Sequence, residues 1–174
     1  YDVEQKPDGG YQSEAKLERS LIQQLQRQGY EYAWIKCEAD LLVNLRKQIE
    51  LLNELTLSDA EWGRLLPMIS NEQMTIQDKT QMIQGDGYIL PLLLDDGTKR
   101  NIRLIDKHNI YNNRLQVTNQ YEVNDGAYKN RYDVTILVNG LPMVQIELKR
   151  RGVDIKEAFN QINRYQRDSF WAGR

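Results

Sequence analysis

Apolar and polar residues alternate along two short segments on either side of Asn139-Gly140. Successive side chains of a strand point to opposite faces, so this period of two predicts a β-hairpin over residues 133–149. The apolar face is made by the following residues of the two strands: Val134, Ile136 and Val138, then Pro142, Val144, Ile146 and Leu148. The opposite face of the hairpin is mainly polar.

The register of this hairpin follows from the requirement that both apolar rows share one face. Paired residue numbers must then sum to an even number, as when Val134 pairs with Val144. A plain two-residue turn at Asn139-Gly140 gives an odd sum and moves one apolar row to the wrong face. A three-residue turn with Gly140 in the left-handed conformation and a bulge pairs Leu137 with Leu141 and restores the even sum. We therefore predict the bulged turn.

Three charged side chains share the polar face in this register. Asp133 lies opposite Gln145 and diagonal to Glu147, and Glu147 and Lys149 point the same way because they are two residues apart. Carboxylates this close repel each other, and a divalent cation relieves that repulsion. The alternative is a solvated strand face with an ion pair that contributes less than about 1 kcal/mol. The basic run that starts at Lys149, the Gln/Tyr helix after it and an acidic helix near the start of the chain favour the metal site.

Helical periodicity dominates the first half of the chain. Ser13 is a good N-cap, and apolar residues at helical spacing predict a helix from there that Gly29 ends. A short strand is expected over 31–35, and residues 38–84 predict three helices that form an insertion or a lid. Two capping boxes support helix starts within this segment: Ser58 with Glu61, and Ser70 with Gln73.

The second half of the chain predicts further strands and a final helix. The strands are a buried apolar strand over Tyr88–Leu94, a second over Ile102–Ile105 and an alternating one over Leu115–Val123. His108 falls in a polar loop, where a surface histidine is expected rather than a catalytic base. Asp154 caps a helix that runs to Arg167. The chain is therefore of the α/β (α+β) class.

The composition describes one domain with a sizeable core. The chain has 174 residues, of which 40% are hydrophobic, and no apolar run reaches the roughly 18 residues of a membrane span. The net charge of −2 gives no global sign of nucleic-acid binding. Residues 149–174 nevertheless carry seven Lys/Arg against three Asp/Glu, a net +4, which leaves −6 for the rest. This asymmetry predicts a basic rim beside an acidic pocket.

The cysteine and histidine content narrows the chemistry. A single cysteine, Cys37, excludes an internal disulfide and a zinc cluster and is typical of a reducing cytoplasm. One histidine argues against histidine-based metal sites or triads. The chain opens with Tyr1 and lacks a signal-peptide pattern, which predicts a piece of a longer protein.

Asp133 followed by Glu147-x-Lys149 resembles the PD-(D/E)xK nuclease superfamily, and Gln161-x-x-x-Tyr165 resembles the additional motif of its RecB-like branch. The longer stretches RYDVTILVNGLPMVQIELK and AFNQINRY are similar to the N-terminal nuclease domain of the restriction (motor) subunit of type I restriction-modification enzymes. The similarity extends back to QSEAKLERSLIQQLQRQGYEY and covers most of the chain. One departure is Tyr132, which stands where the motif has proline.

The resemblance implies a restriction-endonuclease-like core over residues 1–174, a central mixed sheet flanked by helices, with 38–84 as an insertion. It also implies a Mg²⁺ site made by Asp133, Glu147 and the backbone carbonyl of Leu148. Lys149 would orient the attacking water and neutralise charge that develops on the phosphate. Glu14 would be a further ligand; alternatively it only complements the helix dipole, which contributes about 0.3–1 kcal/mol.

Residues around this centre receive supporting roles from the same resemblance. Gln161 and Tyr165 position the catalytic strand or touch the DNA backbone, with packing of their helix on the sheet as the alternative. The residues expected to bind DNA phosphates without reading sequence are Arg150, Arg151 and Arg164.

The family works on double-stranded DNA, together with methylation and specificity subunits, and cuts at non-specific sites after ATP-driven translocation by a helicase motor. This chain has no G-x-x-x-x-G-K-[ST] phosphate loop, so we expect no ATP hydrolysis by it alone. An end at Arg174 would leave a strand edge exposed and predicts dimers or domain swapping.

Two other interpretations stay open at this point. The chain could be a non-catalytic DNA-binding or assembly module whose acidic face is inert. It could also have the nuclease fold but no activity in isolation, because cleavage requires the motor. Loss of Mg²⁺-dependent cutting on substitution of Asp133 separates the nuclease from the inert module.

Overall fold

The computed structural model describes residues 13–71, 73–124, 129–149, 156 and 159–160. The helices are α1 (Glu14–Arg27), α2 (Glu38–Asn53), α3 (Asp59–Ile69) and α4 (Ile76–Gln84), with a 3-10 turn, η1 (Ile110–Asn112). The strands are β1 (Glu31–Tyr32), β2 (Ile89–Leu93), β3 (Lys99–Arg103), β4 (Leu115–Asn124), β5 (Lys129–Val138) and β6 (Leu141–Ile146). None of the helices in these residues is both long enough and apolar enough to cross a membrane.

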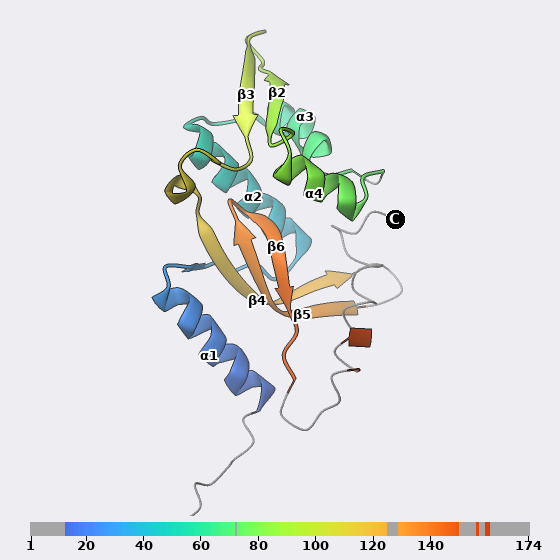
Figure 1. Ribbon diagram of the computed structural model, residues 1–174. Helices are drawn as coiled ribbons and strands as arrows, with labels where there is room; N and C mark the ends of the chain where they lie inside the picture. The colour runs from blue at the N-terminus through green and yellow to red at the C-terminus, as the bar shows by residue number, and fades with distance from the viewer. Residues whose placement is uncertain (1–12, 72, 125–128, 150–155, 157–158, 161–174) are drawn as a thin grey trace, which may run out of the picture.

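A mixed sheet in the order β1-β4-β5-β6 lies at the centre of the fold (Figure 1). β1 runs parallel to β4, whereas β4, β5 and β6 are antiparallel neighbours. Ile22 and Leu25 of α1 pack with Val134 of β5, while Leu41 of α2 packs with Leu137 of the same strand. Since Val134 and Leu137 are an odd number of residues apart, α1 and α2 cover opposite faces of the sheet. The predicted α+β class, a mixed sheet flanked by helices, is confirmed.

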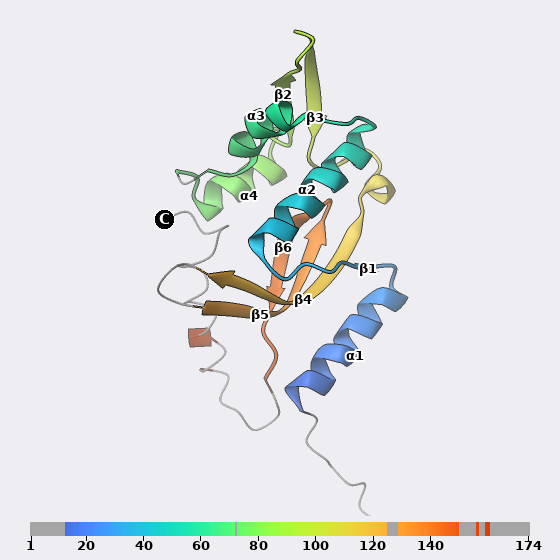
Figure 2. The same cartoon turned by 180° about the vertical axis from the view of Figure 1, so that it is seen from behind.

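A second layer lies at one end of the sheet, where α3, α4 and the β2–β3 hairpin gather next to α2 (Figures 1 and 2). Its core joins α2 to this layer through Leu45, Leu65, Leu92 and Ile102, all of which are buried. β2 alternates between exposed and buried residues, with Ile89 exposed. The prediction of a buried strand over 88–94 was therefore wrong for half of its side chains, because β2 packs on α3 with one face only.

Three helices were predicted within 38–84, and α2, α3 and α4 lie there; of the two predicted capping boxes, one is confirmed. Ser58 caps α3 by accepting from the backbone N–H of Glu61 at 3.1 Å, as its capping box predicted. The box at Ser70 and Gln73 was wrong, because Ser70 instead ends α3. α4 is capped by Thr75, whose hydroxyl accepts from the N–H of Asp78 at 3.1 Å. A threonine followed three residues later by aspartate supplies the same pair of caps.

The β5–β6 hairpin turns differently from the prediction. Val138 pairs with Leu141 across a two-residue turn in which Asn139 has φ 50° and Gly140 has φ 80°. Positive φ at both positions is the requirement of the type I′ turn that Asn-Gly favours. The predicted three-residue turn was therefore wrong.

A bulge in β6 restores the even sum that the apolar pattern requires. Leu137 pairs with Pro142, but Ile136 pairs with Val144, so Met143 is the extra residue. Proline cannot donate to the ladder and is tolerated at bulges. Val134 consequently pairs with Ile146 rather than Val144, two residues further along than predicted.

The tip of the hairpin is fixed by buried polar contacts. The side chain of Asn139 accepts from the N–H of Arg114 at 2.8 Å and donates to the carbonyl of Leu104 at 3.0 Å. At Gly140 an added Cβ would lie 2.7 Å from the Cα of Leu45 in α2. The hairpin register is therefore set partly by contacts with segments far away in the sequence.

We expect Gly140→Ala to destabilise the fold far more than Gly97→Ala. Both glycines have positive φ, which costs an alanine roughly 1–2 kcal/mol. Only Gly140 faces backbone within 4 Å, whereas nothing lies that close to the Cβ position of Gly97. Free energies of unfolding from urea titration of the two variants test this; equal losses would contradict the close packing of the tip on α2.

Candidate active site

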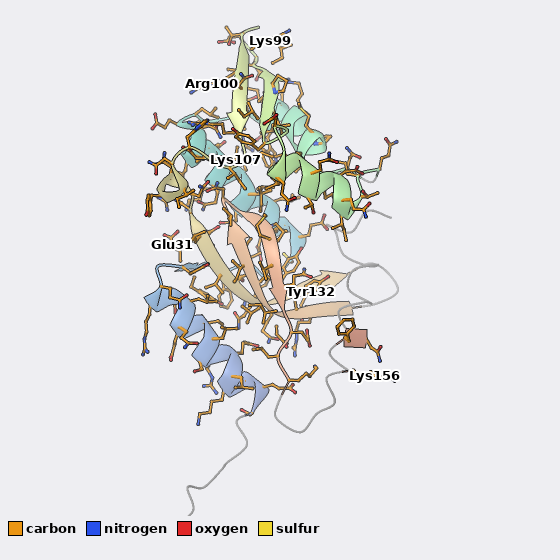
Figure 3. The ribbon with its side chains drawn as sticks, viewed as in Figure 1. Glu31, Lys99, Arg100, Lys107, Tyr132 and Lys156 are labelled. Atoms are coloured by element: carbon orange, nitrogen blue, oxygen red, sulfur yellow. The ribbon has the colours of Figure 1, made fainter. Side chains whose placement is uncertain are left out.

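The bulge brings Asp133 of β5 beside Glu147, just beyond the end of β6. Continuing the Val134–Ile146 pairing by one residue places Asp133 level with Glu147. Asp133 Oδ2 accepts a hydrogen bond from the N–H of Leu148 at 2.8 Å. Tyr132, labelled on β5 in Figure 3, immediately precedes this aspartate and is buried.

The predicted cross-strand partners therefore need one correction. Gln145 lies opposite Thr135, not opposite Asp133. Asp133 and Glu147 were predicted to be diagonal neighbours across the two strands. They are instead directly opposite each other, because the bulge shifts the pairing of β6 by two residues. Although the turn was predicted wrongly, the expected side chains still come together, and Asp133 lies closer to Glu147 than predicted.

Glu147 is a buried carboxyl group with a cation beside it. Its side chain is only 4% exposed, and Lys149 Nζ donates to Glu147 Oε1 at 3.0 Å. Burial raises the pKa of Glu147, and the hydrogen bond from Lys149 opposes this effect, while the charge of Asp133 raises the pKa further. The net direction is upward, so the charged form of Glu147 is disfavoured even with the lysine in place.

Lys149 is held in its charged form by the surrounding acids. Burial lowers the pKa of its ammonium group, but the hydrogen bond with Glu147 and the charges of Glu147, Glu14 and Asp133 outweigh this effect and raise the pKa. The contribution of Glu14 shows that the start of α1 lies within electrostatic reach of the site. Lys149 is therefore a cation over the full physiological pH range.

The donors at this site suit a hard cation. Carboxylate oxygens and backbone carbonyls are the ligands that Mg²⁺ takes from proteins, and two carboxyl groups meet here. Within the described part of the chain, no three His, Cys, Asp or Glu side chains form a metal-binding group. Glu14 thus does not complete a three-carboxylate cluster with Asp133 and Glu147 in this arrangement, and its role as a ligand stays a prediction.

Several predicted site residues lie outside the described residues. They are Arg150, Arg151, Gln161, Arg164 and Tyr165. Of the helix predicted over 154–167, only Lys156, Phe159 and Asn160 are described, and all three are helical. The phosphate-binding and supporting roles of this segment therefore stay predictions.

Glu18, which lies one helical turn beyond Glu14 on α1, was not among the predicted site residues. Its carboxylate accepts from the side-chain amides of Asn119 and Gln120 in β4. Gln120 lies level with Asp133, because the neighbouring pairs are Asn119–Val134 and Tyr121–Tyr132. Residues four apart share a helix face, so the i, i+4 spacing from Glu14 was the available signal.

Comparison with known proteins identifies the family to which this fold and this group of charges belong. The family model described as "Type I restriction enzyme R protein N terminus" matches residues 11–173. The chain belongs to this family. The resemblance inferred from the Asp133, Glu147-x-Lys149 and helix motifs is therefore confirmed at the level of the family.

Curated relatives of this family share high identity with the chain. It is 46% identical over 172 residues to the Type I restriction enzyme EcoprrI endonuclease subunit of Escherichia coli, covering 98% of the chain and 54% of the relative. It is 43% identical over 165 residues to the SsaAORF53P endonuclease subunit of Staphylococcus saprophyticus, covering 92% of the chain and 17% of the relative. The chain thus spans about half the length of the first relative and about a sixth of the second.

We expect Glu147→Gln to stabilise the domain at neutral pH when no divalent ion is present. A carboxyl group whose pKa is raised by folding contributes stability below its ordinary pKa of about 4.3, and this contribution is lost as pH rises through the raised value. Glutamine keeps the shape without the buried charge. The melting temperature should rise by a few degrees at pH 7, and the difference should vanish near pH 4.

Thermal unfolding across pH tests this expectation, with Glu31→Gln as the control. Glu31 is exposed and pairs with Arg114 at 3.4 Å, so its loss should change little. A Glu147→Gln variant that is less stable than the parent at pH 7 would mean that the Lys149 ion pair outweighs the burial of the carboxylate.

Proposed function

We propose that this domain is the Mg²⁺-dependent nuclease of a type I restriction enzyme and cleaves phosphodiester bonds of double-stranded DNA at non-specific positions. The observation that carries the proposal is the meeting of Asp133, Glu147 and Lys149 at the bulged hairpin. Membership of a family whose relatives are named endonuclease subunits supports it.

The buried carboxyl group of Glu147 supports the choice of a divalent cation. Its pKa is raised by burial and by Asp133 although Lys149 already donates to it, so one positive charge does not balance the pair. Asp133, Glu147 and the carbonyl of Leu148 would hold Mg²⁺, with Glu14 as a further candidate ligand. When bound, the ion would polarise the scissile phosphate and make a water molecule more acidic.

Lys149 would supply the positive charge on the protein side of the reaction. Its ammonium group lies beside Glu147 and stays protonated, so it can hold a water molecule or a phosphate oxygen by donating hydrogen bonds. A fixed donor at the place where negative charge develops lowers the barrier because it needs no reorganisation during the reaction. Arg150, Arg151 and Arg164 would bind DNA phosphates, and Gln161 with Tyr165 would position the catalytic strand or contact the DNA backbone.

The remaining parts of the reaction would come from the longer protein. The chain spans 17% of the S. saprophyticus relative, so the ATP-driven motor and the contacts with methylation and specificity subunits would lie in other segments. We place this assembly in the cytoplasm, where its DNA substrate is accessible. The isolated domain would then be inactive without the motor, and dimers or swapped forms of it would arise from exposed strand edges.

We expect Asp133→Ala to slow DNA cleavage strongly while DNA translocation continues. Loss of one carboxylate should reduce the cutting rate by about a hundredfold or more, the scale on which single electrostatic contributions to catalysis act. The measurement uses the full-length subunit assembled with its partner subunits, Mg²⁺ and ATP, and follows cutting and translocation separately.

Asp86→Ala is the matched control, because Asp86 is exposed between α4 and β2. This variant should cut at the parent rate. If Asp133→Ala also cuts at the parent rate, Asp133 is not part of a nuclease site and the domain is a DNA-binding or assembly module.

A further inference from the structure

β4 contains a strained residue at the point where it passes Asp133. Gln120 has φ 55°, a left-handed conformation that side chains other than glycine rarely adopt. The pairs on either side, Asn119–Val134 and Tyr121–Tyr132, keep one register, so no residue is inserted or lost there. Strain of this kind persists only where surrounding contacts enforce it.

Glu18 of α1 supplies such contacts. Its Oε1 accepts from Asn119 Nδ2 at 2.5 Å, and its Oε2 accepts from Gln120 Nε2. Each oxygen of one carboxylate therefore holds one of two consecutive β4 side chains. Hydrogen bonds to a charged acceptor are stronger than those between neutral groups.

Asn119 is also held from its other side, by Tyr32 of β1 and by Lys36 between β1 and α2. Lys36 Nζ donates to the backbone carbonyl of Asn119 at 2.6 Å and to its Oδ1 at 3.0 Å. The hydroxyl of Tyr32 donates to the same Oδ1 at 2.6 Å. Lys36 and Tyr32 fix Asn119 in place. Asn119 therefore cannot move with Glu18, and the hydrogen bonds to Glu18 act on a fixed position in β4.

The regular alternation of β5 side chains between the two faces of the sheet is interrupted at Asp133. Tyr132 and Val134 are two residues apart and would share a face in a regular strand. Tyr132 instead packs in the cluster with Leu41 of α2, whereas Val134 packs in the cluster with Ile22 of α1. β4 and β5 also bend together partway along their length in both views (Figures 1 and 2). Asp133 therefore lies at the bend of β5, level with Gln120 at the bend of β4, and its side chain projects from there.

We infer that Glu18 is a positioning residue for the proposed nuclease: by holding Gln120 in its left-handed conformation, it sets the direction in which Asp133 projects toward Glu147. The inference rests on the proposed function, because it assigns Glu18 a role in the same site. Glu18 acts through Gln120 and the strand bend, and not by contact with the substrate.

The test uses the full-length subunit in its assembled complex and measures DNA cutting over a range of Mg²⁺ concentrations. Glu18→Ala should slow cutting at least tenfold and raise the Mg²⁺ concentration for half-maximal cutting, because the two carboxylates are no longer aligned. Translocation should continue at the parent rate. Glu18→Gln, which keeps the shape but has one acceptor oxygen, should show a smaller change of the same kind and covers the case in which the alanine variant does not fold.

Gln120→Gly provides the rescue. Glycine adopts positive φ without the steric cost of a side chain, so the bend no longer needs Glu18. The Glu18→Ala/Gln120→Gly double variant should therefore recover both the cutting rate and the Mg²⁺ requirement toward the parent values. Glu31→Ala, at the exposed ion pair with Arg114 on the β1 edge (Figure 3), should behave as the parent does.

The outcomes separate this inference from the proposed function. If Asp133→Ala cuts as the parent does, the nuclease assignment itself fails. If Asp133→Ala is inactive but Glu18→Ala and Glu18→Gln keep the parent rate and Mg²⁺ requirement, Glu18 does not position the site. If Glu18→Ala is impaired and Gln120→Gly gives no recovery, Glu18 acts directly and the route through Gln120 is wrong.

Discussion

The burial of Glu147 next to Asp133 is the constraint on which the proposed site depends. A carboxyl group that is 4% exposed loses most of its hydration, and a second carboxylate beside it adds repulsion. Lys149 offsets part of this cost through a hydrogen bond of 3.0 Å. The pKa of Glu147 remains raised, so the arrangement favours a further positive charge. Such an arrangement weakens the fold locally and is expected where charge is needed for binding or catalysis.

The hairpin satisfies two local requirements that conflict with each other. Asn139-Gly140 favours a two-residue turn, whereas the apolar pattern of the strands needs an even register sum. The extra residue at Met143, next to a proline that cannot donate to the ladder, reconciles them. The same bulge determines that Asp133 meets Glu147 instead of Gln145. The grouping of charges is thus a consequence of the bulge, which leaves Ile146 of β6 packed against the cluster that contains Ile22 and Leu25 of α1.

Local signals in the sequence were sufficient for most of the helices and strands, and the pattern of the hairpin was sufficient to expect Asp133, Glu147 and Lys149 in one region. The cap at Ser13, the three helices of 38–84 and the contact between Glu147 and Lys149 follow from spacings of two to four residues. Asp133 reaches Glu147 through the pairing of β5 with β6. The position of the bulge could not be predicted from local spacing, because the turn is held by contacts of Asn139 with Leu104 and Arg114. Glu18 was missed for the same reason: its partners lie 101 and 102 residues away.

The second layer of the fold supports the hairpin that carries the proposed site. The prediction of an insertion or a lid over 38–84 did not include this role. Leu141, at the start of β6, belongs to the buried cluster that contains Leu45 and Ile49 of α2 and Leu104 after β3. The turn itself rests on the α2 backbone at Gly140. A shift of this layer would move the tip of the hairpin, and β5 and β6 connect that tip to Asp133 and Glu147. The layer therefore acts as a support for the hairpin register, and the alignment of the two carboxylates depends on packing at the opposite end of the strands.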